Sequence, residues 1–197
     1  MKLIVTFLFA LFFSNAVTAQ SISYEDFKAI LPLLQKEEYK KIFEKTNVLL
    51  GKTVDDSSEM RGIVNYMNIF SAAGMVTQHK MTHADFLKNA KKFIGHRLVM
   101  AGHPCMDSSG TGFNTLRFVT KDGLLQGHTA STNIAATAIF CFEEFKYATP
   151  VNPKDFIGQT VRCGGILENV EVNPNDSLGW ISRLFIKEAF IRSLMPQ

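Results

Sequence analysis

His103 and Cys105 are the residues whose types and spacing come nearest to a catalytic pair in this sequence. Alternate residues of a β-strand point to the same face, so this histidine could lower the pKa of the thiol and activate it as a nucleophile. Pro104 lies between them, however, and a strand of this kind commonly buries one of its faces. We therefore rank an enzyme with a Cys-His site below the binding functions, and we predict no catalytic residue.

The other titratable residues form no pattern typical of a metal or acid–base site. The chain has five scattered histidines, and its three cysteines include no CxxC motif. Four acidic residues in the second half have no spacing that indicates acid–base catalysis: Asp107, Asp122, Glu143 and Glu144. We predict no metal and no cofactor.

The first residues indicate export. Lys2 precedes an apolar run over residues 3–13, and Val17, Thr18 and Ala19 approximate the small-residue cleavage pattern of a secretory signal peptide. The apolar run is shorter than the roughly 20 residues of a spanning helix. We predict a signal peptide over residues 1–19, a periplasmic or secreted mature protein, and no membrane span after cleavage.

The charge of the chain is close to balanced. There are 21 Lys and Arg residues against 18 Asp and Glu residues, a net charge of +3, and removal of Lys2 would leave about +2. A strong general affinity for nucleic acid or anionic membrane would normally show as a clear basic excess. The composition therefore disfavours both partners.

The exported part contains three cysteines, Cys105, Cys141 and Cys163. An oxidising compartment favours one disulfide with one thiol left over, and three pairings are possible. Our hypothesis is that Cys141 pairs with Cys163. Each lies toward the end of its predicted strand nearest the segment that joins the two strands, whereas Cys105 lies near the opposite end of its own strand.

Residues 20–92 are predicted to be helical. Ser23 is suited to cap a first short helix, and Pro32 fits the first turn of the next. Apolar residues then recur mostly at three- and four-residue steps, and Lys and Glu residues occupy the predicted solvent-exposed face. Two further helices are predicted to begin at capping-box pairs, Asp56 with Glu59 and Thr82 with Asp85.

After this region the pattern changes to short strands. The stretch FIGHRLVMAG, residues 93–102, recurs in altered form as FIGQTVRCGG, residues 156–165, and each copy predicts the opening of a strand. Gly102 and Gly165 predict a bulge or a close backbone approach. Five strands are predicted in all, over residues 96–106, 113–121, 134–142, 160–172 and 180–191.

Over residues 93–191 the sequence resembles OB-fold proteins of the nucleic-acid-binding, tRNA-anticodon-like type. The resemblance rests on residues 95–102, 134–142, 158–165 and 180–191. It implies an α+β fold in which the helical region precedes a five-stranded, OB-like Greek-key β-barrel over residues 93–195. It also implies a ligand face on the second and third strands, flanked by the loop after the first strand and the loop between the last two.

The ligand face implied by the resemblance would need exposed aromatic side chains and cations. The candidates are Phe113, Arg117, Lys121, Trp180 and Arg183. Trp180 begins the last predicted strand, where it either projects toward a ligand or fills the end of the barrel. The two flanking loops carry Asp107 and Asp176 and no basic residue, which disfavours nucleic acid.

We therefore predict an exported, non-enzymatic binding module that recognises a protein or peptide partner through an OB-like barrel. The alternative is a module that binds an oligosaccharide or single-stranded nucleic acid on the barrel face. An enzyme is the least favoured reading.

Overall fold

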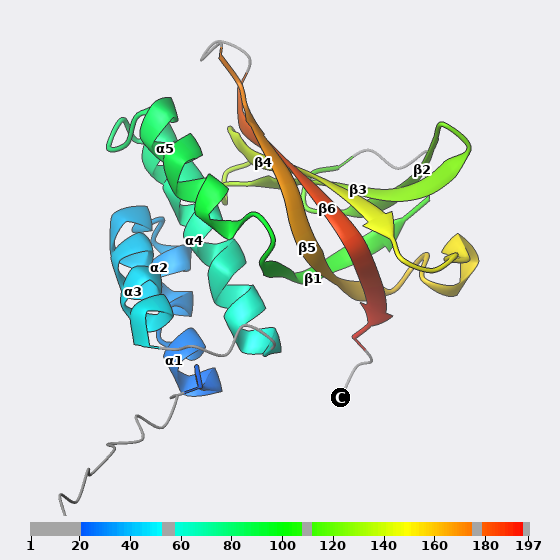
Figure 1. Ribbon diagram of the computed structural model, residues 1–197, viewed down its shortest axis with the longest axis horizontal. Coiled ribbons are helices and arrows are strands. Elements are labelled where there is room, and N and C mark those ends of the chain that lie inside the picture. The colour runs from blue at the N-terminus through cyan, green and yellow to red at the C-terminus, as the bar shows by residue number, and fades with distance from the viewer. Residues whose placement is uncertain (1–20, 53–57, 108–111, 175–178, 195–197) are drawn as a thin grey trace, which may run out of the picture.

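The computed structural model describes residues 21–52, 58–107, 112–174 and 179–194 of the chain (Figure 1). The predicted signal peptide, residues 1–19, lies outside this part. Within it, no helix is long and apolar enough to cross a membrane. The chain is mixed α+β, with its helices N-terminal to a six-stranded sheet.

The described helices are α1 (Tyr24–Lys28), α2 (Leu31–Gln35), α3 (Tyr39–Lys52), α4 (Glu59–Thr77) and α5 (His83–Ala90). The predicted caps at Ser23 and Thr82 are confirmed: each hydroxyl accepts a hydrogen bond at 3.1 Å from the backbone N–H three residues later. Helix α4 is instead capped by Ser58, whose hydroxyl accepts from the N–H of Arg61. The predicted cap Asp56 lies outside the described residues.

The strands are β1 (Arg97–Met106), β2 (Leu116–Lys121), β3 (Leu124–Thr132), β4 (Ile139–Tyr147), β5 (Thr160–Val172) and β6 (Trp180–Ser193). They pair in a closed ring in the order β1-β2-β3-β4-β6-β5. The β1–β2 and β4–β6 pairs are parallel, and the other pairs are antiparallel. The sheet therefore has an inner face and an outer face.

The predicted number of five strands is wrong, because residues 124–132 form β3 rather than a polar connection. Asp122 and Gly123 have φ angles of 52° and 77° and make the tight turn of a β2–β3 hairpin. Asp-Gly is a strong signal for such a turn. The third predicted strand, 134–142, is displaced for the same reason: the chain turns after β3, and the next strand begins at Ile139.

The two FIG stretches open strands, as predicted. One short 3₁₀ helix, Lys91–Phe93, ends at the first residue of one stretch, and another, Pro153–Asp155, precedes the other. The glycines of the two stretches, Gly95 and Gly158, have φ angles of +86° and +83°. The N–H of Gly95 donates to a carbonyl of β5, and the N–H of Gly158 donates to a carbonyl of β1, each at 2.8 Å. The two openings thus lie at opposite ends of the antiparallel β1–β5 pair.

The predicted irregularities at Gly102 and Gly165 are also confirmed. The pairing register shifts between Val99 and Gly102 in β1, and again between Gly164 and Ile166 in β5. A Cβ atom added to Gly165 would lie 2.6 Å from the carbonyl oxygen of Lys187. Glycine therefore permits the close β5–β6 approach that bends the sheet.

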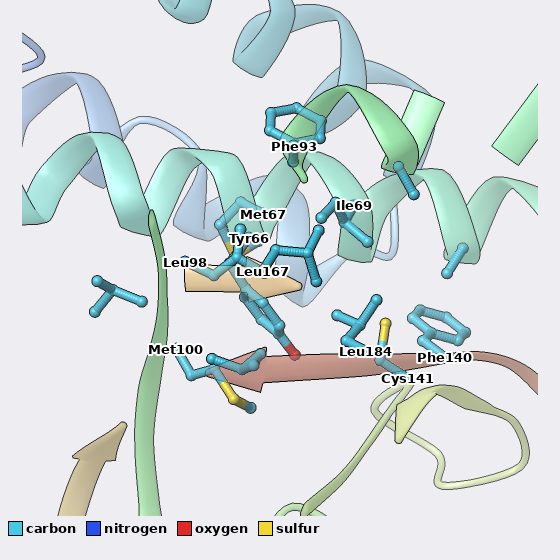
Figure 2. Packing of buried hydrophobic residues seen from close by; sticks show 14 of the residues in the cluster. Tyr66, Met67, Ile69, Phe93, Leu98, Met100, Phe140, Cys141, Leu167 and Leu184 are labelled. Atoms are coloured by element: carbon cyan, nitrogen blue, oxygen red, sulfur yellow. The ribbon is translucent and has the colours of Figure 1, made fainter. Parts of the chain in front are cut away.

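The helices pack on the closed sheet through α4, which is buried along most of its length. Its side chains join those of the inner face in one hydrophobic cluster, so the helical region and the sheet share a core. Figure 1 shows α4 and α5 beside the sheet, with α1–α3 farther out. Within the cluster, Tyr66 extends away from α4 with its hydroxyl at the far end (Figure 2).

Candidate functional site

A hollow of about 670 Å³ lies on the outer face of the sheet, over β2, β3, β4 and β6. Pockets of roughly 300–1,000 Å³ are typical of ligand sites. We call it the outer hollow. It is lined by Gly112, Phe113, Thr115, Arg117, His128, Thr129, Ala130, Phe142, Glu144 and Arg183.

Strand register explains how these side chains come together. Arg117 of β2 lies opposite His128 of β3, which lies opposite Glu144 of β4. A second row, two residues along, contains Ala130 and Phe142, with Arg183 of β6 opposite Phe142. Directly opposite side chains on one face are close enough to interact. The floor is thus a grid with a polar row beside a more apolar one.

Glu144 links the cations of the outer hollow. Its carboxylate oxygens lie 3.5 Å from Lys121 Nζ and 3.4 Å from Arg183 Nε, and Arg183 also approaches Glu171 at 3.7 Å. Arg117 is different: its guanidinium donates at 2.7 Å to the carbonyl oxygen of Gly112, and it makes no ion pair within the described part of the chain. Positive charge is therefore least compensated at the Arg117 end.

His128 lies between Arg117 and Glu144 with its Nε2 atom buried. No group among the described residues forms a hydrogen bond with that atom. Loss of hydration is the largest influence on this imidazole and lowers its pKa, against the opposing attraction of Glu144. The ring is therefore neutral at pH 7.

The structure places three of the five predicted binding residues in the lining of the outer hollow, whereas Trp180 lines a second hollow, between β6 and the α4–α5 connection. Phe113, Arg117 and Arg183 line the outer hollow, and Lys121 contacts it through its ion pair with Glu144. Trp180 lies beside it: the Arg183 guanidinium is 5.7 Å from the indole centroid, and the Phe142 ring is 5.9 Å away. Phe113 is 47% exposed, which leaves an aromatic surface open at the rim.

Sequence reasoning missed His128, Phe142 and Glu144 as members of this site. His128 lies in β3, whose residues the sequence predicts to be a polar connection. Phe142 and Glu144 belong to the outward-facing alternation of β4, whose predicted span ended at Phe142. The Asp122-Gly123 turn was the signal that could have revealed β3 and, with it, the cross-strand row.

Glu143, the neighbour of Glu144, points the opposite way and is fully buried on the inner face. Its carboxylate accepts hydrogen bonds from the hydroxyls of Tyr66 at 2.7 Å and Thr129 at 2.5 Å, and Tyr66 also contacts the Ser131 hydroxyl at 2.9 Å. Burial raises the pKa of Glu143 to about 7, although the hydrogen bonds oppose this shift. These hydrogen bonds connect α4, through Tyr66, to β3 and β4.

His103 and Cys105 both face inward, as their spacing predicts, but they are buried. The Nδ1 atom of His103 lies 2.9 Å from the carbonyl oxygen of Asn114, which fixes it as the protonated donor. Burial raises the pKa of the Cys105 thiol to about 11 and lowers that of His103. A thiol of this kind is protonated at neutral pH, the opposite of an activated nucleophile.

The predicted Cys141–Cys163 disulfide is not formed in the structure, where all three cysteines are free and buried. Strand β6 lies between β4 and β5, so the two cysteines are not on neighbouring strands. Cys141 pairs with Ser182 and Cys163 with Ile191, nine residues farther along β6. That offset is about 30 Å along a regular strand, far beyond the Cα separation of a disulfide.

Searches against protein-family models, curated proteins and solved structures found no match to this chain.

Proposed function

We propose that this chain is an exported, non-enzymatic binding module that recognises a protein or peptide partner through the outer hollow. The observation that carries the proposal is the juxtaposition of the open Phe113 ring, the Phe142 side chain and two arginines around one cavity. Aromatic residues and arginine are the side chains most enriched at the centres of protein interfaces.

The position of the outer hollow supports an OB-like arrangement with one additional strand. OB-folds bind ligands on the face of their second and third strands and on the adjoining loops. The outer hollow lies over the β2–β3–β4 part of the ring, and Gly112 and Phe113, from the connection between β1 and β2, contribute to its wall. The closed strand order is compatible with this arrangement.

The charges favour a protein partner over nucleic acid. A phosphate backbone needs a groove of free cations. Here Glu144 lies in the floor of the outer hollow and is paired with two of the three cations around it. Oligosaccharide or single-stranded nucleic acid remains our second candidate, because Phe113 offers a stacking surface beside Arg117.

Site-specific photocrosslinking would test the proposal. A benzophenone amino acid in place of Phe113 should capture a discrete partner from the native envelope or secreted fraction. The same group in place of Val48, which is 55% exposed on α3, is the matched control and should capture none. Identical products at both positions, or no product at Phe113, would refute the proposal.

The identity of the captured species separates the two candidates. A polypeptide identified by mass spectrometry supports the protein partner. Nuclease-sensitive or glycosidase-sensitive products support the second candidate instead. A nucleic-acid complex would also weaken steeply between low and physiological salt.

A further inference from the structure

We infer that the outer hollow recognises an acidic peptide segment in which a carboxylate side chain lies next to an apolar one. This inference rests on the proposed function and names the chemistry of its partner. The carboxylate contacts Arg117, and the apolar side chain packs between Phe113 and Phe142.

The first step is the state of Arg117. Its contact with the Gly112 carbonyl orients the guanidinium at the wall of the outer hollow and uses only part of its donor capacity. Arginine carries five N–H donors in a planar fork that matches a carboxylate. Since Arg117 forms no ion pair within the described part of the chain, this fork is available to a partner.

The second step is the difference between the two ends of the site. Arg183 already shares the carboxylates of Glu144 and Glu171, so an incoming anion gains less there. At the Arg117 end the neighbouring imidazole of His128 is neutral, and its buried Nε2 has no partner among the described residues. The Arg117 end is therefore where an incoming carboxylate meets a guanidinium that is not already paired with a carboxylate of the described chain.

The third step is the apolar row beside this polar one. Ala130 and Phe142 form its floor, and the exposed ring of Phe113 stands at its rim. These side chains give an apolar group a surface one row away from the carboxylate position, about 7 Å along the strands. A single carboxylate beside an apolar side chain therefore matches both rows, whereas repeated anionic groups would meet Glu144.

Trp180 provides the assay, because it is the chain's one tryptophan and contacts two residues that line the outer hollow. The probes are blocked tetrapeptides: Gly-Asp-Phe-Gly, its neutral match Gly-Asn-Phe-Gly, and Gly-Asp-Gly-Gly, which lacks the apolar side chain. The first should change Trp180 fluorescence saturably, and each of the others should bind at least about ten-fold more weakly, as expected for one lost charged hydrogen bond or one lost apolar contact.

Three variants sharpen the test. Arg117→Ala should weaken binding of the Gly-Asp-Phe-Gly peptide about ten-fold or more, while Lys88→Ala, which removes an exposed cation on α5, should leave it unchanged. Glu144→Gln should strengthen binding, since it removes the only carboxylate among the described residues that line the hollow. A gain of affinity cannot result from general damage to the fold. Circular dichroism establishes that each variant is folded.

The inference is overturned if the Asp and Asn peptides bind equally, if Arg117→Ala has no effect, if no peptide binds saturably, or if an oligothymidylate binds more tightly than the Asp peptide. Photocrosslinking at Phe113 separates these failures from failure of the proposed function. A polypeptide captured there, without acidic-peptide binding, would retain the binding face and reject the chemistry assigned to its partner.

Discussion

Glu143 should make the stability of this protein fall as the pH rises, because its carboxyl is fully buried between α4 and the inner face of the sheet. Burial raises its pKa from the usual 4.5 to about 7 in the folded chain. The folded state therefore holds its proton over a pH range in which the unfolded state has lost it. The stability that follows is complete below about pH 4.5 and is lost as the pH rises through 7.

The magnitude follows from the size of this shift. A pKa difference of about 2.5 units corresponds to about 3 kcal/mol, at 1.36 kcal/mol per unit. Between pH 5 and pH 8, Glu143 should therefore lower the free energy of unfolding by about 2.5 kcal/mol. A loss of this size is a substantial part of the 5–15 kcal/mol that stabilises a typical domain.

Urea denaturation at pH 5, 6, 7 and 8 would measure this effect in the mature wild type and in Glu143→Gln. The amide has nearly the same shape and cannot ionise, so the variant should gain about 2.5 kcal/mol relative to wild type between pH 5 and pH 8. Subtracting the two curves removes the contributions of other titrating groups, such as the buried His103.

The control is Glu168→Gln, which changes an exposed glutamate on β5 that pairs with Lys146. The free energy of unfolding of this variant should differ from that of wild type by the same amount at each of these pH values. If the free energy of unfolding of Glu143→Gln also changes with pH as in wild type, within about 0.5 kcal/mol, Glu143 does not titrate as its burial requires, and the reasoning from the burial of its carboxyl is wrong.

Two further predictions concern backbone approach and thiol burial. Gly165→Ala should destabilise the protein by about 1–3 kcal/mol in urea denaturation, because the new Cβ would lie 2.6 Å from the Lys187 carbonyl oxygen. Gly51→Ala, in α3, should instead be neutral or stabilising, because an added Cβ there would meet no atom within 4 Å beyond the helix's own backbone, and equal losses would contradict the packing argument. All three cysteines should resist iodoacetamide in the native protein and react after unfolding without reductant, since each is buried and free. A disulfide-linked peptide found by mass mapping would contradict this expectation.

The parts of the fold that could be predicted from sequence are those determined by neighbouring residues. The caps at Ser23 and Thr82 depend on contacts across three positions, and β6 depends on alternation within its own segment. The missed strand β3 lacks such a pattern, because polar residues occur on both of its faces. Thr129 and Ser131 point inward to the Glu143 carboxyl, while His128 faces the outer hollow.

The composition of the candidate site likewise depends on residues that are far apart in the sequence. Phe113, Arg117 and Arg183 were predicted one by one as an aromatic residue or cations beside apolar neighbours, but their common position depends on the register of four strands. Two adjacent glutamates of β4 show this: Glu143 lies in the core, and Glu144 lines the outer hollow. Their opposite environments follow from the two-residue period alone, so a strand that contains both contacts helix α4 on one face and the outer hollow on the other.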